Sequence, residues 1–289
     1  MPILVVASAE PGVGRSLVAA ALAYRLGREG RAVTLARLTG DAGADADATT
    51  FSRLDGIVAP VAPVEQAQVA SLSGDVILEA PAGNVDGLVR ALDARVLVVG
   101  GPASAMDVGA PPGRVAGHVL TNVPLHAVPT VAQRAAVVAV LPEDRVLAAP
   151  SIADIAAALR AEWLIQQGAP GGIERVMIGT VASDAASPYF GNRERTCVVT
   201  RFDKTDIQLA ALLTDVECMV ITGGGRPSPY LLDRVRGTRD DVAVLLAPEN
   251  TVETMRVIEG LYGRSRFDGM VKLERAVALL DEAGVAVSF

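Results

Sequence analysis

Aromatic side chains are scarce in this sequence, where Phe, Trp and Tyr together make up 3% of 289 residues, although apolar residues make up 51%. A core with so few rings must be built from Ala, Val, Leu and Ile, which suits parallel strands packed between helices. The apolar content is ample for a core, so disorder is not expected. The length accommodates one or two domains.

Cysteine, histidine and lysine are each represented by only two residues. Cys197 and Cys218 fall in predicted strands, so we expect buried, reduced thiols in a cytoplasmic protein. His118 and His126 have no metal-like spacing to the cysteines, and we expect them to be structural. The sequence contains no nucleophilic triad, metal-ligand cluster or redox motif, and so gives little support to a hydrolase, a metalloenzyme or an oxidoreductase.

Long apolar runs and basic clusters are also missing. No run approaches the length of a membrane span, and the N-terminus has neither the basic region nor the cleavage site of a signal peptide. The net charge of −7 is spread over the chain, which argues against a nucleic-acid or membrane-surface footprint. We therefore expect neither nucleic acid nor membrane as a partner.

What the sequence does have is a strand, a glycine turn and a helix near its N-terminus. An apolar run at 3–6 is followed by Gly12 and Gly14, and Ser16 opens a helical pattern. Glycine adopts conformations that let backbone amides converge on a phosphate, and the helix N-terminus adds partial positive charge. We predict a phosphate-binding loop here; the alternative is a strand-to-helix turn without a ligand.

The loop departs from the usual phosphate-loop pattern, in which a glycine and four residues precede glycine, lysine and serine or threonine. Its window is AEPGVGRS, where Ala9 replaces the first glycine and Arg15 replaces the lysine. Gly14 and Ser16 fit the pattern. Arginine is planar and wider than the compact ammonium of lysine, so we expect Arg15 to hold a phosphate in a different geometry.

Polar residues end other predicted strands of the first half: Arg37 after AVTLA, Glu79 after DVIL, and Asn122 in GHVLTNVP. The carboxyl ends of parallel strands share one edge of the sheet, where open α/β sheets bind ligands. Glu79 is therefore a candidate for binding Mg²⁺ or positioning a substrate, with a plain surface acid as the alternative.

Three acids, Asp41, Asp45 and Asp47, follow the second strand. Acids near a phosphate site can hold Mg²⁺ directly or through water. The alternative is a solvated loop that caps a helix beginning near Asp47. We favour that alternative for Asp41 but not for the other two.

Alternating strands and helices predict a mostly parallel, doubly wound domain in the first half. We expect a helix around 64–72, a loop or very short helix over 101–114, and a helix over 151–164. Ser151 and Asp154 form a capping-box pair at the start of the last helix. A cluster of glycine and proline at 166–172 predicts a boundary, which gives the domains 1–166 and 173–289.

The second half repeats the alternation on a smaller scale, and its strand-to-helix loops would gather at one edge. Three glycines in TGGGRPSP expose backbone amides beside a cationic side chain, which suits an anion. The alternative is a tight turn, and Asp203 and Lys204 would then pair weakly at the surface. The predicted anion site comprises Asp203, Lys204, Thr222, Gly223, Gly224 and Arg226, with Asp184 and Gly225 near it.

Together these motifs resemble the N-terminal region of long bacterial phosphotransacetylases and its stand-alone relatives, in which a dethiobiotin-synthetase-like domain precedes a DRTGG domain. The resemblance covers nearly the whole chain. It rests on AEPGVGRS, DADATTF, ILEAPAG, LTNVP and VLPEDRVLAAPSIADI, then on IGTVASDAASPYF, FDKTDIQLAAL and ITGGGRPSP. It implies an α/β fold: a doubly wound, mostly parallel sheet of P-loop NTPase type, then a smaller α/β domain. The catalytic phosphotransacetylase domain would follow, so acetyl transfer is not implied.

The likeness to dethiobiotin synthetases implies a site for ATP or ADP with Mg²⁺. The nucleotide would be held by Glu10, Pro11, Gly12, Val13, Gly14, Arg15, Ser16 and Leu17. Ser16, Asp47 and Glu79 would surround Mg²⁺. Arg37 stands near a lysine that serves the substrate carboxylate in that family, and Asn122 would meet the adenine. Arginine in place of two lysines affects catalysis more than binding.

These residues favour a regulatory or sensory nucleotide-binding protein with weak or no hydrolysis, which passes its signal to a protein partner or to a second copy of itself. The same hypothesis includes a different ligand, another anionic effector that would bind at the Gly223 edge. An alternative is a Mg-ATP-dependent ligase acting on a carboxylate, as in dethiobiotin synthetase or cobyrinate amidase. A further alternative is a scaffold that binds no nucleotide. Neither the substrate nor the partner follows from the sequence.

Overall fold

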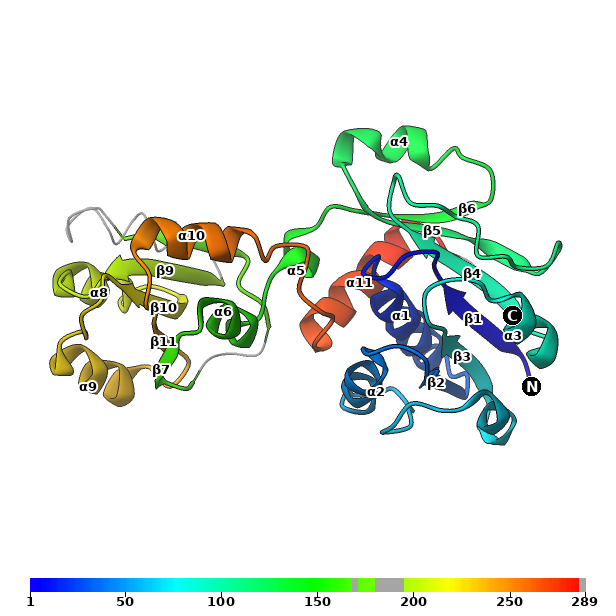
Figure 1. The fold of residues 1–289 in the computed structure, drawn as a ribbon, viewed down its shortest axis with the longest axis horizontal. Coiled ribbons are helices and arrows are strands. Elements are labelled where there is room, and N and C mark those ends of the chain that lie inside the picture. The colour runs from blue at the N-terminus through cyan, green and yellow to red at the C-terminus, as the bar shows by residue number, and fades with distance from the viewer. Residues whose placement is uncertain (168–170, 180–194, 286–289) are drawn as a thin grey trace. The chain divides into compact units, whose positions relative to one another are not determined.

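The computed structural model describes residues 1–167, 171–179 and 195–285. It divides into two compact units, drawn in Figure 1. The first unit comprises Met1–Leu147 together with Phe267–Phe289, and the second comprises Ala148–Arg266. Within the described residues, every helix is too short or too polar to cross a membrane.

A six-stranded, fully parallel sheet in the order β2-β3-β1-β4-β5-β6 forms the centre of the first unit. Its strands are β1 (Ile3–Ala7), β2 (Val33–Arg37), β3 (Asp75–Glu79), β4 (Arg95–Gly100), β5 (Val115–Val123) and β6 (Val137–Pro142). β1 lies between β3 and β4, so β2 and β3 fill the sheet on one side of it and β4, β5 and β6 fill the other. This order confirms the predicted doubly wound fold and places the end of β1 where such sheets bind ligands.

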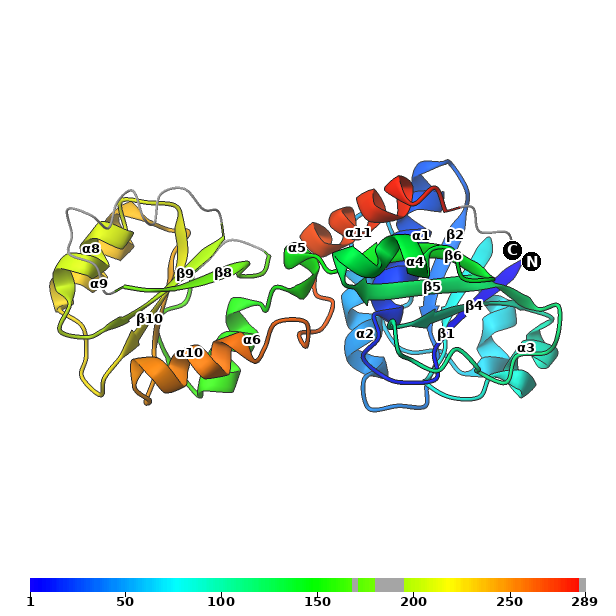
Figure 2. The same cartoon turned by 90° about the horizontal axis from the view of Figure 1, so that it is seen from above.

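Both faces of this sheet are buried, which explains why its strands are continuous apolar runs. Leu4 and Val6 of β1 pack with α1 (Arg15–Arg28) and α11 (Met270–Glu282). Ile3 and Val5 pack on the opposite face, with α3 (Asp86–Leu92) and the 3₁₀ helix η1 (Gln66–Ser71). Figures 1 and 2 show α11 beside α1. The remaining helices of this part are α2 (Ala44–Ser52), η2 (Leu125–Ala127), α4 (Val128–Val131) and α5 (Arg145–Ala148).

The second unit is a smaller sheet in the order β7-β11-β10-β9-β8, in which only β7 runs antiparallel. Its strands are β7 (Glu162–Ile165), β8 (Arg175–Ile178), β9 (Thr196–Arg201), β10 (Val216–Thr222) and β11 (Ala243–Leu246). One face packs against α6 (Ile152–Leu159) and α10 (Thr251–Glu259), and the other against α8 (Thr205–Ala211) and α9 (Pro229–Thr238). The predicted smaller α/β sheet is confirmed. Cys197 and Cys218 are buried, unpaired thiols on adjacent strands.

The limits of the two units differ from those of the predicted domains, 1–166 and 173–289. The second unit begins earlier and ends earlier than the predicted second domain. The predicted helix over 151–164 ends at Leu159, and its last residues form β7 at the edge of the second sheet. At the other end, α11 returns to the first unit, because its apolar stripe packs on α1. The residues 166–172 therefore follow a strand of the second unit and do not separate the two.

Local predictions agree with the structure more closely. The Ser151 and Asp154 capping box is present. The stretch 101–114 contains turns without a helix, as expected. The helix predicted near Asp47 begins three residues earlier, at Ala44, and the helix expected around 64–72 is the tighter 3₁₀ helix η1.

Candidate functional site

The glycine loop between β1 and α1 has the backbone conformation that the sequence predicts. Gly12 has φ 76° and Gly14 has φ 84°, both in the left-handed region that favours glycine. Gly14 is the N-cap of α1, and within the described residues no side chain caps this helix and no acid lies in its first turn. The first amides of α1 are therefore available to an anion, where the helix dipole favours one.

Side-chain hydrogen bonds hold the loop against the neighbouring strands. Thr121 of β5 donates through Oγ1 to the carbonyl oxygen of Val13 at 2.7 Å. Ser8 donates to the carbonyl oxygen of Glu10 at 2.5 Å, and the carboxylate of Glu10 accepts from Ser104 at 3.1 Å. We did not predict Thr121 or Ser104. A threonine next to the end of a buried strand, as in LTN, is the signal that points to the first.

Glu79, at the end of β3, lies beside the start of α1 and is fully buried. Its Oε1 accepts a 2.9 Å hydrogen bond from Ser16 Oγ and lies 3.5 Å from Arg15 Nε. Its Oε2 lies 3.6 Å from Arg37 Nε. The fold thus brings together four of the predicted site residues, from β2, β3 and α1.

Arg37 is the most tightly bound cation of this group, and its side chain is fully buried. Its Nη2 donates to Asp41 Oδ2 at 2.6 Å and its Nε donates to Asp47 Oδ2 at 3.3 Å. Its Nη1 donates to the carbonyl oxygens of Leu38 at 2.7 Å and Glu79 at 3.4 Å. Arg37 therefore ties the end of β2 to α2 and β3, and is not presented at the surface.

Arg15 is held more loosely than Arg37. Its ion pairs with Glu79 and Asp41 span 3.5 and 3.8 Å. Its Nη1 is buried and makes no hydrogen bond with any described residue. The cation of the loop is thus turned inward onto carboxylates, and its side chain is only 8% exposed.

The pKa values of this group reflect burial and opposite charges. Burial raises the pKa of Glu79 to about 7, because the lowering by Arg37 and Arg15 does not offset the loss of water and the repulsion from Asp47. Burial also raises the pKa of Asp41, but Arg37 outweighs it and holds the value below the usual range. Desolvation lowers the pKa of Arg15.

The predicted Mg²⁺ ligands do not fit a metal ion in the arrangement that the structure gives them. Ser16 donates its proton to Glu79, and both Asp47 and Glu79 face the Nε atom of Arg37. A divalent cation beside two guanidinium groups would be repelled by both of them. No group of three or more His, Cys, Asp or Glu side chains suited to a metal was found among the described residues.

Of the remaining predicted residues of the first unit, Val13 and Leu17 are partly buried against the core, and the others are exposed. Glu10 and Pro11 lie on the outer side of the loop, and Asp45 lies on α2. Asn122 is exposed on β5, with φ 52°. Asn122 thus lies in the irregular register of β5 against β6 between Leu120 and Val123, one residue after the Thr121 anchor.

A second glycine run, Gly223–Gly225, follows β10 at the carboxyl edge of the second sheet. Gly223 and Gly224 have φ 89° and 78°. A Cβ added at Gly225 would lie 2.5 Å from the ring of Phe202, so that ring packs directly against the run. Thr222, just before it, is buried and shares a 2.8 Å hydrogen bond with the hydroxyl of Thr251.

The charged residues of this second edge are paired with each other. Arg226 donates to both carboxylate oxygens of Glu162, at 2.6 and 2.7 Å, and Glu162 begins the antiparallel strand β7. Asp203 pairs with Arg201 at 3.0 Å, and not with Lys204 as the alternative had it. These pairs are exposed and of small energetic weight. Asp184 lies outside the described residues.

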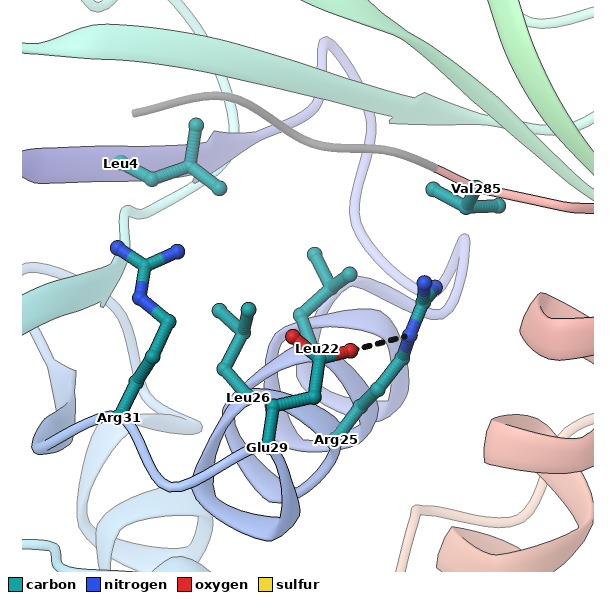
Figure 3. Close-up of a pocket in the computed structure, with 7 residues that line it drawn as sticks. All are labelled: Leu4, Leu22, Arg25, Leu26, Glu29, Arg31 and Val285. Carbon is teal, nitrogen blue, oxygen red and sulfur yellow. Dashed lines mark ion pairs between the residues drawn. The ribbon is translucent and has the colours of Figure 1, made fainter.

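A separate pocket lies at the other end of α1 (Figure 3). It is lined by Leu4, Leu22, Arg25, Leu26, Glu29, Arg31 and Val285. Arg25 forms an ion pair with Glu29 there. The pocket contains none of the predicted site residues, so it is distinct from the glycine loop.

Comparison with known proteins identifies the second unit. The DRTGG domain model matches residues 154–261. A phosphate acetyltransferase of Nitratidesulfovibrio vulgaris (strain Hildenborough) is 26% identical over 157 residues, which is 49% of this chain and 21% of that protein. A solved structure of the CBS and DRTGG domains of the regulatory region of Clostridium perfringens pyrophosphatase, complexed with the activator diadenosine tetraphosphate, is 20% identical. It covers 41% of this chain and 51% of its own, with a TM-score of 0.34.

The fold and the sites define a two-unit α/β protein with a phosphate-loop-like turn in its first unit. Residues 154–261 are a DRTGG domain, and the chain is a distant homologue of phosphate acetyltransferase over about half its length. The chain spans about a fifth of the length of that relative. The expected resemblance to phosphotransacetylases is thereby confirmed.

Proposed function

We propose that this protein is a regulatory or sensory protein that binds an adenine nucleotide, ATP or ADP, at the loop between Ala9 and Ser16, with weak or no hydrolysis. The observation that carries this proposal is the pair of left-handed glycines, Gly12 and Gly14, directly before a helix without a side-chain cap. Such a turn presents converging backbone amides to a phosphate.

Weak hydrolysis is supported by the position of the loop cation. In phosphoryl transfer a cation neutralises charge on the transferring group. Arg15 instead faces Glu79 and Asp41. Backbone amides alone can bind a phosphate, but they leave this charge without its usual side-chain partner.

A regulatory role is supported by the DRTGG domain and by the distant phosphate acetyltransferase homologue, of which this chain corresponds to only a fifth. The nucleotide signal would pass to a protein partner or to a second copy of the chain. The Gly223 edge of the DRTGG unit would be a second anion site, because Gly223 and Gly224 there are exposed and left-handed.

A thermal shift experiment with ATP, ADP, GTP and cyclic nucleotides tests the proposal. A ligand at a hundred times its dissociation constant adds about 2.7 kcal/mol of stability, so we expect a clear rise in Tm with ATP or ADP. A rise with another nucleotide alone would move the ligand site to the DRTGG unit. If no nucleotide raises the Tm, the remaining candidate is a scaffold that binds no nucleotide.

Turnover separates the regulatory function from the alternative of a ligase that activates a carboxylate. We expect no ADP release above background when Mg-ATP is incubated with small carboxylates. Steady release that is lost in Glu79→Ala would assign a ligase, because Glu79 is the acid that contacts both Ser16 and Arg15.

A further inference from the structure

We propose that the guanidinium groups of Arg15 and Arg37 take the place of a divalent cation at the carboxyl edge of the first sheet, so that this site binds its anionic ligand without Mg²⁺. The statement about the ligand rests on the proposed function. The statement about the two arginines rests on the geometry of the site alone.

Each carboxylate of the site already has a cationic neighbour. Asp47 and Asp41 accept hydrogen bonds from Arg37. Glu79 lies between the two arginines, at 3.5 Å from Arg15 Nε and 3.6 Å from Arg37 Nε. Three acids facing two guanidinium groups leave little net charge to attract a divalent ion.

The two arginines belong to the folded core and are not surface residues that happen to lean inward. Both are nearly or fully buried, at 8% and 0% side-chain exposure. Arg37 also donates to two backbone carbonyls, of Leu38 and Glu79, which fixes its plane. A buried guanidinium with this many partners costs much to move.

The two arginines differ in how firmly their side chains are held. Arg37 is hydrogen-bonded throughout and serves as the fixed charge that replaces a metal. Arg15 has longer contacts and a buried Nη1 without a hydrogen-bond partner among the described residues. Arg15 is therefore the less tightly bound of the two charges beside the loop, while Arg37 neutralises Asp47 and Glu79.

Thermal and urea unfolding of the full chain test whether Mg²⁺ restores the stability that is lost when an arginine is replaced. Wild-type stability should not respond to Mg²⁺ alone, compared with potassium chloride at equal ionic strength. Arg37→Gln removes the buried cation that Asp41, Asp47 and the buried Glu79 share, so its folding equilibrium constant should fall by roughly a hundredfold or more. Mg²⁺ should restore that constant by at least about tenfold, since Asp47 has then lost its Arg37 partner and only the longer contacts of Arg15 remain.

A matched control is Arg275→Gln, which removes a partly buried arginine from Asp144, at 2.8 Å, and from the exposed Glu282, at 3.8 Å. Its stability should fall without any Mg²⁺ response. If Arg37→Gln does not fold, Arg15→Gln decides the question, because its contacts are longer and its loss should be milder. Mg²⁺ stabilisation of the wild type, or no Mg²⁺ response in the variant that folds, would overturn the inference.

Nucleotide binding separates failure of this inference from failure of the proposed function. ADP that stabilises the wild type equally in EDTA and in Mg²⁺ supports both. ADP that acts only with Mg²⁺ overturns the metal-free site and keeps the nucleotide-binding function. If ADP never acts, the proposed function fails, while Mg²⁺ rescue still judges the role of the arginines.

Discussion

Ser16 in the first turn of α1 donates a 2.9 Å hydrogen bond to Glu79 at the end of β3. This bond joins the helix that follows the glycine loop to the buried carboxyl group at the centre of the charged cluster. Any change in the charge of Glu79 therefore acts on the start of α1. The predictions below test this connection, the anchoring of the loop, and the second glycine run.

The charge of Glu79 should make the stability of the protein depend on pH. Its pKa is about 7 when folded, against an ordinary value of 4.5, so between these values the folded state keeps a proton that the unfolded state has lost. Stability should therefore rise as pH falls from 7 towards 4.5, by on the order of 3 kcal/mol at most.

Urea unfolding of wild type and Glu79→Gln across this pH range measures the effect. The glutamine can still accept the hydrogen bond from Ser16 but does not titrate, so the difference in stability between the two proteins should change with pH. Asp45→Asn, which alters an exposed acid on α2, is the control and should follow the wild type. Parallel curves for wild type and Glu79→Gln would contradict the account.

Thr121 should matter through its hydroxyl group. Thr121→Val keeps the shape of the side chain but removes the 2.7 Å hydrogen bond to Val13, so we expect a loss of about 1 kcal/mol of unfolding free energy. Nucleotide affinity should also weaken several-fold, because the loop loses its anchor to β5. Thr121→Ser keeps the hydroxyl and should behave like the wild type. Equal behaviour of the two variants would show that the bond does not position the loop.

The second glycine run should tolerate no side chain at Gly225. Gly225→Ala places a Cβ 2.5 Å from the ring of Phe202, so the ring must move, at a cost of roughly 1–3 kcal/mol. Phe202→Leu added to this variant should recover part of the loss. Gly237→Ala in α9, where an added Cβ meets nothing within 4 Å, is the control and should be neutral or stabilising. A neutral Gly225→Ala would mean that Phe202 does not fix the run.

Much of the fold could be predicted because the decisive signals are local. The apolar run before Gly12 and the helical pattern after Ser16 identify β1 and α1 without any long-range information. The capping box of Ser151 and Asp154 similarly marks the start of α6. Such patterns depend only on residues that are neighbours in the chain, and the structure confirms the elements that they predict.

What could not be predicted depends on partners distant in sequence. The segment Glu162–Ile165 follows the helix α6 closely, and its pairing with β11 makes it a strand. The amphipathic pattern of α11 predicts a buried face but not that this face lies on α1. Pairing and packing of this kind decide domain limits, so the predicted limits differ from the observed units.

The candidate site shows the same contrast between what local sequence predicts and what depends on distant partners. The sequence placed Arg37, Asp47 and Glu79 at one edge of the sheet, and the structure brings them together. It could not show that the guanidinium groups face the carboxylates, because that depends on side-chain direction and burial. The choice between a cation that faces a ligand and one that faces the protein is visible only in the folded chain.

The most direct test of the central claim is a calorimetric titration of ATP and ADP into two variants and the wild type. Gly14→Ala forces a left-handed backbone, φ 84°, on alanine in the loop, and Gly30→Ala imposes the same strain, φ 83°, just beyond the other end of α1. We predict saturable binding to the wild type and to Gly30→Ala. Binding to Gly14→Ala should be weaker by tenfold or more, equivalent to about 1.4 kcal/mol. Equal affinities in both variants, or no heat with the wild type, would contradict nucleotide binding at this loop.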